Sequence, residues 1–432
     1  MDYIRKNWAG VEVWHPSQIA NPASLEELRQ VILKAQAEKM KIRVVGSLHS
    51  YICETPGLQL HTDKLCRILS LDKAKGWVRV EAGMKMRKLV EYLASQGLAL
   101  PNQGYILKQS IAGVISTATH GTGKTGTLSS FVEEIELVDA SGNLRALNAK
   151  TNPHLFNAAV VSLGCLGVIY AVTLRCVPLF KLDLSLTQST FAETAQELPE
   201  LIKEYDHFQW IVDPYSDSSL KFAAKRTSAD KHTTVWYQVN RFLRTGANIA
   251  MMDYLPSISW LNRRLLRTLY FPFLSFKTRV VDDGYRLLSP SDEPHYVEEE
   301  IAVPAESAEK AFSEMRHLVT EFTTKNGPDV IALVCRFVEA DSYGYLSPTQ
   351  GRRSAYIVPV MRLKSQYKEL YKQFETAMLK YSGRPHWGKY HTLTPDMIQK
   401  LYGENYTQFI EARRELNPEG VFLNKAMEAL FK

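Results

Sequence analysis

The sequence predicts an α+β protein with two domains and a C-terminal segment, and three observations carry this prediction. The chain has 432 residues, 45% hydrophobic and 23% charged, as is ordinary for a globular protein with two or three cores. Strands and helices alternate up to Pro178, as in an α/β domain. Beyond Pro178, strands interleave with amphipathic helices to about Ser382, as in a separate α+β domain. The predicted parts are residues 1–178, 179–382 and 383–432.

The first helix and strand lead to the most informative turn of the chain. Ser24 and Glu27 form a capping box, and apolar residues recur on one helical face up to about Lys39. A β-branched run at 42–45 predicts a buried strand, which ends in Gly46-Ser47-Leu48-His49-Ser50. Gly46 lets backbone N–H groups approach an anion, and His49 is placed to meet a bound cofactor. The alternative is that His49 is an ordinary surface or core residue.

The other elements of the first domain follow in order. We expect a strand at 77–83, a helix at 86–96 that Gly97 ends, a hairpin turning at 141–143, a helix at 154–162 and a strand at 167–177. In the second domain, strands are predicted at 182–186 and 208–212, and a helix with one apolar face at 311–322 stops near Gly327. Residues 255–276 predict a packed helix with a basic edge, with an interfacial membrane helix as the alternative.

Residues 109–123 form a stretch rich in small and hydroxylated residues, whose backbone can contact a flat or charged group. The stretch runs on into Lys124-Thr125 and nearly matches the phosphate loop G-x-x-x-x-G-K-[ST]. Ala118 replaces the first glycine, however, and no buried strand precedes the loop. A nucleotide hydrolase is therefore a minor hypothesis, which predicts magnesium-dependent ATP turnover that Thr125→Ala abolishes.

Composition excludes several classes of protein. The net charge of +6 is spread along the chain, so nothing indicates a nucleic-acid partner. The five cysteines are widely spaced without a C-x-x-C pair, which argues against a disulfide framework and a zinc site, and no metal site is predicted. The chain has neither a signal-peptide core nor a run of the ~18 apolar residues that a membrane span needs. We expect a cytoplasmic protein without membrane association.

Three stretches together carry a family resemblance: the His49 turn, the small-residue run to Gly123, and Gly383-Arg384-Pro385-His386-Trp387-Gly388-Lys389. From about Asn7 to Asn424, the chain resembles the FAD-linked sugar-1,4-lactone and alditol oxidases (gulonolactone, arabinonolactone and alditol oxidases) of the vanillyl-alcohol oxidase superfamily. The resemblance implies a two-domain vanillyl-alcohol-oxidase-type flavoprotein. Residues 1–178 would form an FAD-binding domain of the PCMH type, 179–382 an inserted substrate (cap) domain, and 383–432 a segment that returns to the FAD domain.

The resemblance also implies FAD bound covalently through His49. The histidine of a G-x-G-H-S turn bonds to a methyl group of the flavin in this family, and here Leu48 replaces the second glycine, which puts the bond in question. A second, cysteinyl link is not expected, because residues 110–113 hold no cysteine. The implied cofactor-binding residues are Gly46, Ser47, Leu48, His49, Ser50, Ser110, Gly113, Thr117, His120, Gly121, Thr122, Gly167, Val168 and Lys389.

Three catalytic residues are implied by the same resemblance. Ser110 matches a serine of the substrate pocket, Lys389 a lysine that faces substrate and flavin, and Arg336 the arginine of an E-x-R strand motif. Arg336 would hold the oxygen of the reacting alcohol or the charge that gathers on reduced flavin. Fixed positive charge beside an electron-rich ring stabilises such negative charge. The alternative for each cation is an ordinary place on the surface.

The substrate side departs from the family pattern. The E-x-R motif is Val334-Cys335-Arg336, so a valine replaces its carboxylate, and Glu339 would point away from the face of Arg336. The strand at 355–360 lacks the family's histidine and threonine, and Pro359 predicts an edge or irregular strand. We therefore expect a less polar pocket than that for an alditol. Tyr343, Tyr356, His386 or a bound water would take the substrate proton.

Two functional hypotheses remain. The first is an FAD-dependent oxidase or dehydrogenase that removes a hydride from a carbon bearing a hydroxyl or an amine and passes it to the flavin. Its partners are a small-molecule substrate and oxygen or another electron acceptor. The second is a flavin-binding protein without oxidase activity that serves as a structural or partner subunit. It accounts for the missing carboxylate but leaves Arg336 and the stretch 383–389 unexplained.

Overall fold

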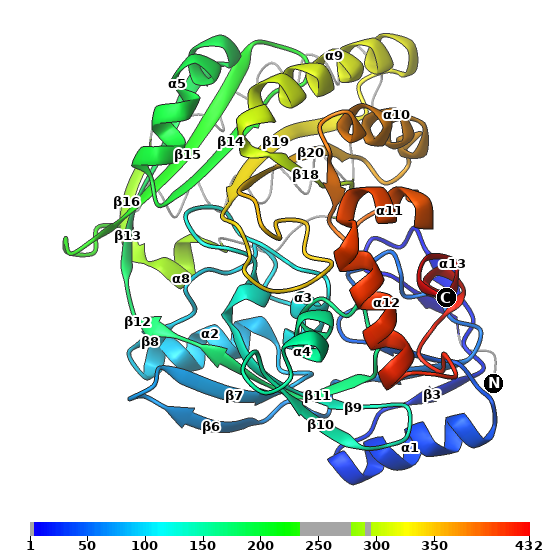
Figure 1. Cartoon of the computed structure of the whole chain (residues 1–432). Helices are drawn as coiled ribbons and strands as arrows, with labels where there is room; N and C mark the ends of the chain where they lie inside the picture. The colour runs from blue at the N-terminus through cyan, green and yellow to red at the C-terminus, as the bar shows by residue number, and fades with distance from the viewer. Residues whose placement is uncertain (1–3, 234–277, 290–294) are drawn as a thin grey trace.

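The computed structural model describes residues 4–233, 278–289 and 295–432. The helix expected at 255–276 therefore lies outside the described residues. Figure 1 shows two stacked halves: an N-terminal half below, and a second half above that is built on one large sheet. In the part of the chain described, no helix is both long and apolar enough to cross a membrane. The same residues contain no group of three or more side chains suited to hold a metal ion.

The N-terminal half contains two main sheets. A three-stranded parallel sheet has the order β3-β5-β4, and a five-stranded antiparallel sheet has the order β10-β9-β11-β7-β6. The strands are β3 (Gln18–Ala20), β4 (Ile42–Val45), β5 (Leu58–His61), β6 (Ile68–Asp72), β7 (Trp77–Glu81), β9 (Val132–Val138), β10 (Leu144–Leu147) and β11 (Val168–Arg175). The α/β prediction fits only the small sheet, because short turns join β6 to β7 and β9 to β10, and such turns produce antiparallel pairs.

The helices of this half lie close to their predicted bounds. Ser24 caps the first one through a hydrogen bond from the N–H of Glu27, and Gly97 adopts φ +76° just after the second. The helices are α1 (Leu25–Ala37), α2 (Met86–Ser95), α3 (Ile111–Ser116) and α4 (Pro153–Val160). Two short pairs complete the half: β1 (Arg5–Lys6) with β2 (Val13–Trp14), and β8 (Leu98–Ala99) with β12 (Val177–Pro178).

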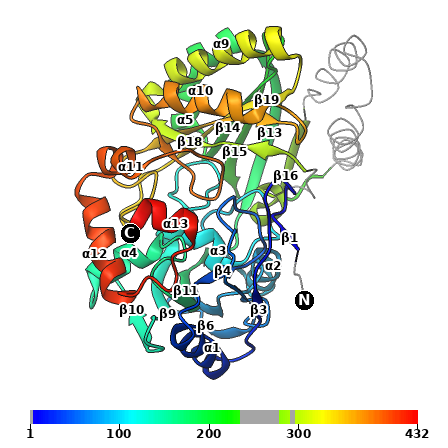
Figure 2. The ribbon, with the colours of Figure 1, turned by 90° about the vertical axis from the view of Figure 1, so that its right-hand side faces the viewer.

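The second half is a nine-stranded antiparallel sheet with helices on its outer face. Figure 2 shows α9 and α10 on the side away from the N-terminal half. The strands are β13 (Lys181–Thr190), β14 (His207–Val212), β15 (Ser218–Thr227), β16 (Thr278–Asp283), β17 (Val297–Glu298), β18 (Ile301–Pro304), β19 (Val330–Val338), β20 (Ser354–Met361) and β21 (Arg384–Pro385). The helices are α5 (Phe191–Glu204), α8 (Gly284–Leu287), α9 (Ala308–Asn326) and α10 (Tyr367–Leu379).

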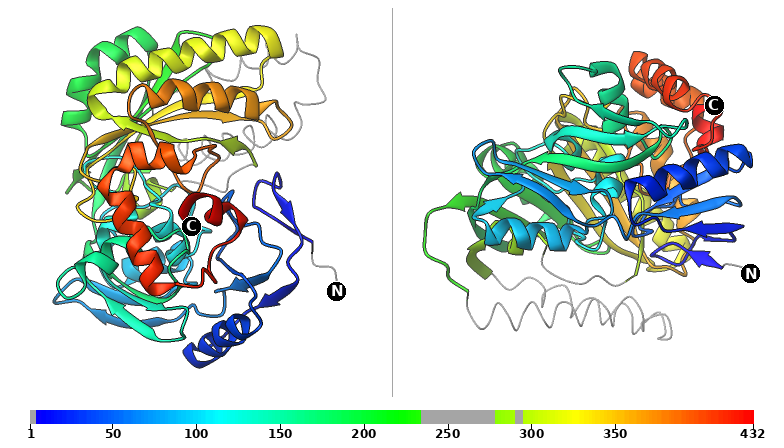
Figure 3. Two further views of the ribbon diagram at one scale, coloured as in Figure 1. Left: turned by 45° about the vertical axis from the view of Figure 1, so that its right-hand side comes forward. Right: turned by 90° about the horizontal axis from the view of Figure 1, so that it is seen from below.

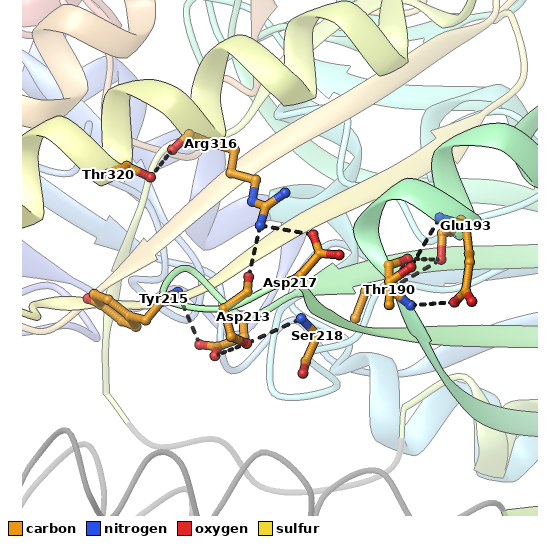
Figure 4. A network of polar contacts seen from close by, with 11 residues as sticks. Thr190, Glu193, Asp213, Tyr215, Asp217, Ser218, Arg316 and Thr320 are labelled. Atoms are coloured by element: carbon orange, nitrogen blue, oxygen red, sulfur yellow. Dashed lines mark hydrogen bonds and ion pairs between the residues drawn. The ribbon is translucent and has the colours of Figure 1, made fainter.

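Polar side chains cap α5 and connect the middle of α9 to a turn of this sheet (Figure 4). Thr190 and Glu193 form a capping box at the start of α5. Arg316 of α9 forms an ion pair with Asp217 at 3.1 Å and donates to the carbonyl of Ser216. Between helices and sheet lies an apolar core that includes Trp210 and Phe312. The opposite face of the sheet is left for the site described below.

Pro359 does not mark an edge strand but an irregular stretch of an interior one, so only the first of the two predicted alternatives is wrong. β20 pairs with β19 on one side and with β17 and β18 on the other. Ile301 faces Ile357 and Glu298 faces Val360, but no ladder bonds form between these two pairs. A proline is tolerated there because that stretch of the ladder needs no N–H donor.

The residues after Ser382 lead back to the N-terminal half. Figures 1 and 3 show α11 (Pro395–Tyr402), α12 (Glu404–Leu416) and α13 (Lys425–Phe431) running down one side of the molecule. The N–H of Ile42 donates to the carbonyl of Val421 at 2.8 Å, so this segment lies directly against β4. The amide of Asn424 donates to the carbonyls of Ile52 and Glu54. The segment thus fixes the chain on both sides of the His49 turn.

Candidate active site

A cavity opens beside the turn that follows β4. Its walls come from that turn, from α3 and from the loop before β11, and most of the lining residues are small or hydroxylated. Those that the sequence analysis named are Gly46, Ser47, Leu48, His49, Ser50, Ser110, Gly113, Thr117 and Gly167. A Cβ on Gly46 would lie 1.9 Å from Ser110 Oγ, so only glycine lets the turn approach α3 this closely. Arg43 also lines the cavity.

Leu48 keeps the turn without the glycine that the family pattern has there. Its φ is +58°, in the left-handed region that favours glycine. The N–H of Trp8 donates to the Leu48 carbonyl at 2.7 Å, and the side chain packs against Trp14, Val45 and Cys53. These contacts hold the backbone where a glycine would otherwise be needed. The departure at Leu48 therefore leaves the turn intact.

His49 is half-buried and uncharged at the cavity wall. Its ring stacks on Trp8 with a centroid distance of 5.2 Å and an interplanar angle of 25°. Burial, together with the positive charges of Lys389 and Lys85, lowers the pKa of His49 to about 3. Among the described residues, nothing hydrogen bonds to Nδ1 of His49 or to Oγ of Ser110, although both atoms are buried. Two unsatisfied polar atoms at a glycine-lined wall fit a bound polar group.

Cations and hydroxyls near this turn suit an anionic ligand. Lys85 Nζ lies 2.7 Å from both Ser47 Oγ and Asp63 Oδ1, and it is about one third exposed. Arg43 is buried and donates to the carbonyl of Leu163. The pyrophosphate of FAD carries the charge that such donors bind. The residues at this cavity therefore fit FAD.

A second cluster of charged side chains adjoins the His49 turn from the second half of the molecule. Lys389 forms an ion pair with Glu298 and lies 3.4 Å from Glu300 Oε1. Arg336 Nη1 lies 4.0 Å from Glu300 Oε2, and His120 Nε2 lies 3.1 Å from the same oxygen. The position where a Cβ of Gly388 would stand is 3.5 Å from Ser50 Oγ, so the cluster and the turn are neighbours. We call these five residues (His120, Glu298, Glu300, Arg336 and Lys389) the charged cluster.

The two carboxyl groups of the charged cluster differ in their electrostatics. Burial raises the pKa of Glu298, and the negative charge of Glu300 adds to the effect. Burial also acts to raise the pKa of Glu300, but Lys389, the hydrogen bond with His120 and the charge of Arg336 together hold that pKa well below its usual range. Glu300 is therefore ionised at neutral pH.

Five of the implied cofactor-binding residues do not line the cavity. Lys389 and His120 belong to the charged cluster instead. The Thr122 hydroxyl donates to the carbonyl of Phe208, Val168 packs in the core, and a Cβ on Gly121 would lie 2.4 Å from the Gln103 carbonyl. These last three are packing positions behind the site, which the small-residue run could not reveal.

The phosphate-loop hypothesis does not fit the structure. The loop follows the short helix α3 rather than a strand, and Gly123 pairs with Val338 of β19. Lys124 Nζ lies 4.0 Å from Asp206, and Thr125 Oγ1 accepts a hydrogen bond from Asn102. Residues 123–125 thus connect the two halves of the molecule.

Of the candidate proton acceptors, Tyr356 and His386 lie beside the charged cluster and Tyr343 lies away from it. Tyr356 stacks on His120 at 3.6 Å, and the Nδ1 of buried His386 accepts the N–H of Gly388. Burial lowers the pKa of His386 to about 3, and burial raises the pKa of Tyr356 well above its usual value. Tyr343 packs its exposed ring on Phe156, outside the charged cluster.

The sequence analysis missed Glu298 and Glu300. Their carboxyl groups make the pocket more polar than the sequence predicted. Val334, Tyr356 and Val358 do form an apolar wall, and Glu339 pairs outside the cluster with Arg353 at 2.8 Å. The carboxylates come instead from the segment that joins β17 to β18. No local pattern revealed them, because three consecutive acids before the apolar run 301–303 are ordinarily expected at the surface.

Comparisons with known proteins agree with this site. Over the whole chain, the structure is similar to two solved cholesterol oxidases: a solvent-stable enzyme (TM-score 0.81, 15% identity, 98% of that chain covered) and the enzyme from B. sterolicum (TM-score 0.84, 14% identity, 97% covered). At such identities the likeness shows the fold alone. Residues 16–148 match the FAD binding domain family, and this range contains the His49 turn.

Fold and site together define an FAD-dependent oxidoreductase that acts on CH–OH donors. Residues 172–430 match the family described as D-arabinono-1,4-lactone oxidase, and the chain belongs to this family of FAD-dependent sugar-lactone oxidoreductases. The L-gulono-1,4-lactone dehydrogenase of Mycobacterium tuberculosis is 34% identical over 98% of both chains. Mouse L-gulonolactone oxidase is 31% identical over 99% of this chain and 98% of its own length. These relatives favour an enzyme over a flavin-binding subunit without activity.

Proposed function

We propose that this protein oxidises a secondary hydroxyl of a sugar-1,4-lactone to a carbonyl group, with FAD bound through His49. The observation that carries the proposal is the charged cluster beside the His49 turn. Arg336 and Lys389 offer hydrogen-bond donors to the oxygen of the reacting alcohol, and the adjacent carboxylates suit a polyhydroxylated substrate better than an apolar one. The relatives named above act, by their names, on L-gulono-1,4-lactone and L-gulonolactone.

FAD, when bound, supplies the acceptor for the hydride that leaves the substrate carbon. The protein supplies position and charge. Ser110 contributes a hydroxyl to the wall of the FAD cavity, and Arg336 and Lys389 hold the substrate oxygen at the neighbouring cluster. Glu298 and Glu300 hold Lys389 between them, which fixes the cation in a buried site. Oxygen or another compound then takes the electrons.

The substrate proposal is tested by flavin absorbance under anaerobic conditions. L-Gulono-1,4-lactone and D-arabinono-1,4-lactone are each mixed with the purified protein, with an alditol as the comparison. We expect a lactone to bleach the flavin band and the alditol to bleach it much more slowly. A band that no lactone bleaches overturns the proposal. Admitting oxygen or a dye acceptor to the bleached sample identifies the compound that restores the colour.

The attachment proposal concerns Nδ1 of His49, which is neutral and lacks a hydrogen-bond partner among the described residues. A neutral imidazole nitrogen has the lone pair that a bond to the flavin methyl group needs. After acid precipitation we expect the yellow colour in the pellet for the wild type and in the supernatant, or absent, for His49→Ala. His154→Ala, which changes a histidine beside Tyr345, is the matched control and keeps the colour in the pellet. Wild-type colour in the supernatant contradicts the covalent bond while leaving FAD binding in place.

A further inference from the structure

Oxidation of an alcohol releases a proton as well as a hydride, and the sequence leaves the acceptor of that proton open. The family's carboxylate would stand at position 334 on β19, on the same face as Arg336, but Val334 stands there. Val334 is buried in the apolar wall with Tyr356 and Val358. The valine side chain at position 334 therefore cannot accept a proton.

Glu300 reaches the same Arg336 from a different strand. Glu300 follows β17, which pairs with β20, and β20 pairs with β19, so the segment from Val297 to Ile301 lies across β20 from β19. Side chains alternate along an extended segment, and Glu299 lies on the other side, buried beside Glu375 of α10. The alternation sends Glu298 and Glu300 together toward Lys389.

His120 helps to keep Glu300 ionised, because its hydrogen bond lowers the pKa of this carboxyl group. Nδ1 of His120 lies 2.8 Å from the carbonyl of Gly121, and because a carbonyl only accepts, Nδ1 carries a hydrogen. Nε2 lies 3.1 Å from Glu300 Oε2, within hydrogen-bond distance, and this contact lowers the pKa of Glu300. Oε1 remains for another donor and lies 3.4 Å from Lys389 Nζ. A substrate hydroxyl held by Lys389 would thus meet Oε1.

We propose that Glu300 replaces the carboxylate missing at position 334 and takes the hydroxyl proton of the substrate. This inference rests on the proposed function. The C–H bond breaks as the hydride leaves for FAD, the O–H bond breaks as its proton passes to Glu300 Oε1, and the carbonyl C=O forms. The proton leaves to solvent when the product does. An ionised carboxylate is a sufficient base here, because loss of the hydride makes the hydroxyl strongly acidic.

The decisive measurement is the rate of anaerobic flavin reduction by the lactone in a set of variants. Glu300→Gln keeps the size of the side chain and removes the base, and we expect a loss of about 10²–10⁴-fold, the range typical of a general base. Adding Val334→Glu to Glu300→Gln returns a carboxylate to Arg336, and we expect at least a tenfold recovery. Glu299→Gln and Glu339→Gln change acids outside the cluster and keep the wild-type rate.

A pH profile gives a second readout that a structural role would not move. The charged or titratable groups around Glu300 are His120, Glu298, Arg336, Tyr356, His386 and Lys389. Because His120 helps to hold the pKa of Glu300 low, His120→Asn raises that pKa. We expect the acid limb of the reduction rate to move to higher pH in His120→Asn, and to disappear in the slow Glu300→Gln protein.

The outcomes separate the two proposals. If the lactone reduces the wild type and Glu300→Gln, with normal flavin content, reduces within twofold of it, Glu300 is not the base. If Glu300→Gln loses its flavin, the acid limb of His120→Asn decides, and an unmoved limb overturns the inference. If no lactone reduces the wild type, the proposed function fails and this inference fails with it.

Discussion

Leu48 illustrates how a single residue can depart from a family pattern without loss of the structure. The left-handed conformation costs a residue with a Cβ about 1–2 kcal/mol. The hydrogen bond from Trp8 contributes about 0.5–1.5 kcal/mol, and burial of the leucine side chain against Trp14 adds to it. The strain is therefore offset locally, next to the histidine that would carry the flavin.

The first prediction at this scale concerns Gly46. In Gly46→Ala the new methyl group would lie 1.9 Å from Ser110 Oγ, so α3 or the turn must move, at a cost of about 1–3 kcal/mol. We expect a lower Tm and a lower flavin content per protein. The double variant Gly46→Ala/Ser110→Gly removes the clashing atoms and should recover most of both quantities. Equal flavin content in Gly46→Ala and wild type would show that the close approach is not needed.

At the scale of elements, the segment from Val297 to Pro304 supplies charged groups to the site and a buried acid to the contact with α10. Glu298 and Glu300 supply charge to the site, whereas Glu299 lies buried beside Glu375 on α10. Burial, reinforced by the charge of Glu375, raises the pKa of Glu299 well above its usual 4.5. The folded protein therefore favours a neutral Glu299, while the adjacent Glu300 is ionised.

This pKa makes stability depend on pH. Below about pH 4.5, Glu299 is protonated in both the folded and the unfolded chain and costs nothing. As pH rises, the unfolded chain releases the proton first, so stability falls by about 1.4 kcal/mol per pH unit until the folded pKa is passed. Glu299→Gln replaces the titratable carboxyl group with an amide that does not ionise. We expect the Tm difference between Glu299→Gln and wild type to grow in favour of the variant from pH 5 to pH 8.

The control for this prediction lies on the same helix as Glu375. Glu369 of α10 pairs with Lys325 on the surface, and Glu369→Gln should leave the pH dependence of Tm as it is in the wild type. A Tm difference for Glu299→Gln that stays constant with pH would mean that Glu299 is ionised in the folded protein.

At the scale of the whole molecule, the C-terminal segment closes the N-terminal half. Asn424 is almost fully buried, its amide donates to the carbonyls of Ile52 and Glu54, and its Oδ1 caps α13 at Met427. Asn424→Ala would remove the cap and leave the carbonyls of Ile52 and Glu54 without this donor. We expect a loss of about 2–4 kcal/mol.

The measurements for Asn424→Ala are Tm and the flavin that survives repeated ultrafiltration of a His49→Ala background. Residues 52–54 follow the His49 turn, so flavin should leave faster when Asn424 is absent. Lys425→Ala changes the exposed neighbour and should match its parent in both measurements. Unchanged Tm in Asn424→Ala would show that this return contact is dispensable.

Much of this arrangement could be predicted from local pattern. The strand before His49, the cap at Ser24 and the apolar face of α9 are fixed by short-range chemistry, so sequence alone located them. The interior place of Pro359 depends on which strands flank β20, and the role of Glu300 depends on a strand pairing between distant segments. Patterns of period two identify faces, but they do not identify the neighbour across a sheet.

The hydrogen bond between Ile42 and Val421 also affects the order in which the protein folds during its synthesis. Domains fold during translation from the N-terminus onward, yet β4 meets this backbone partner only after Val421 has left the ribosome. A nascent chain that has already presented the His49 turn lacks the segment that holds both of its flanks. We therefore expect capture of FAD to follow synthesis of the segment from Val421 to Asn424.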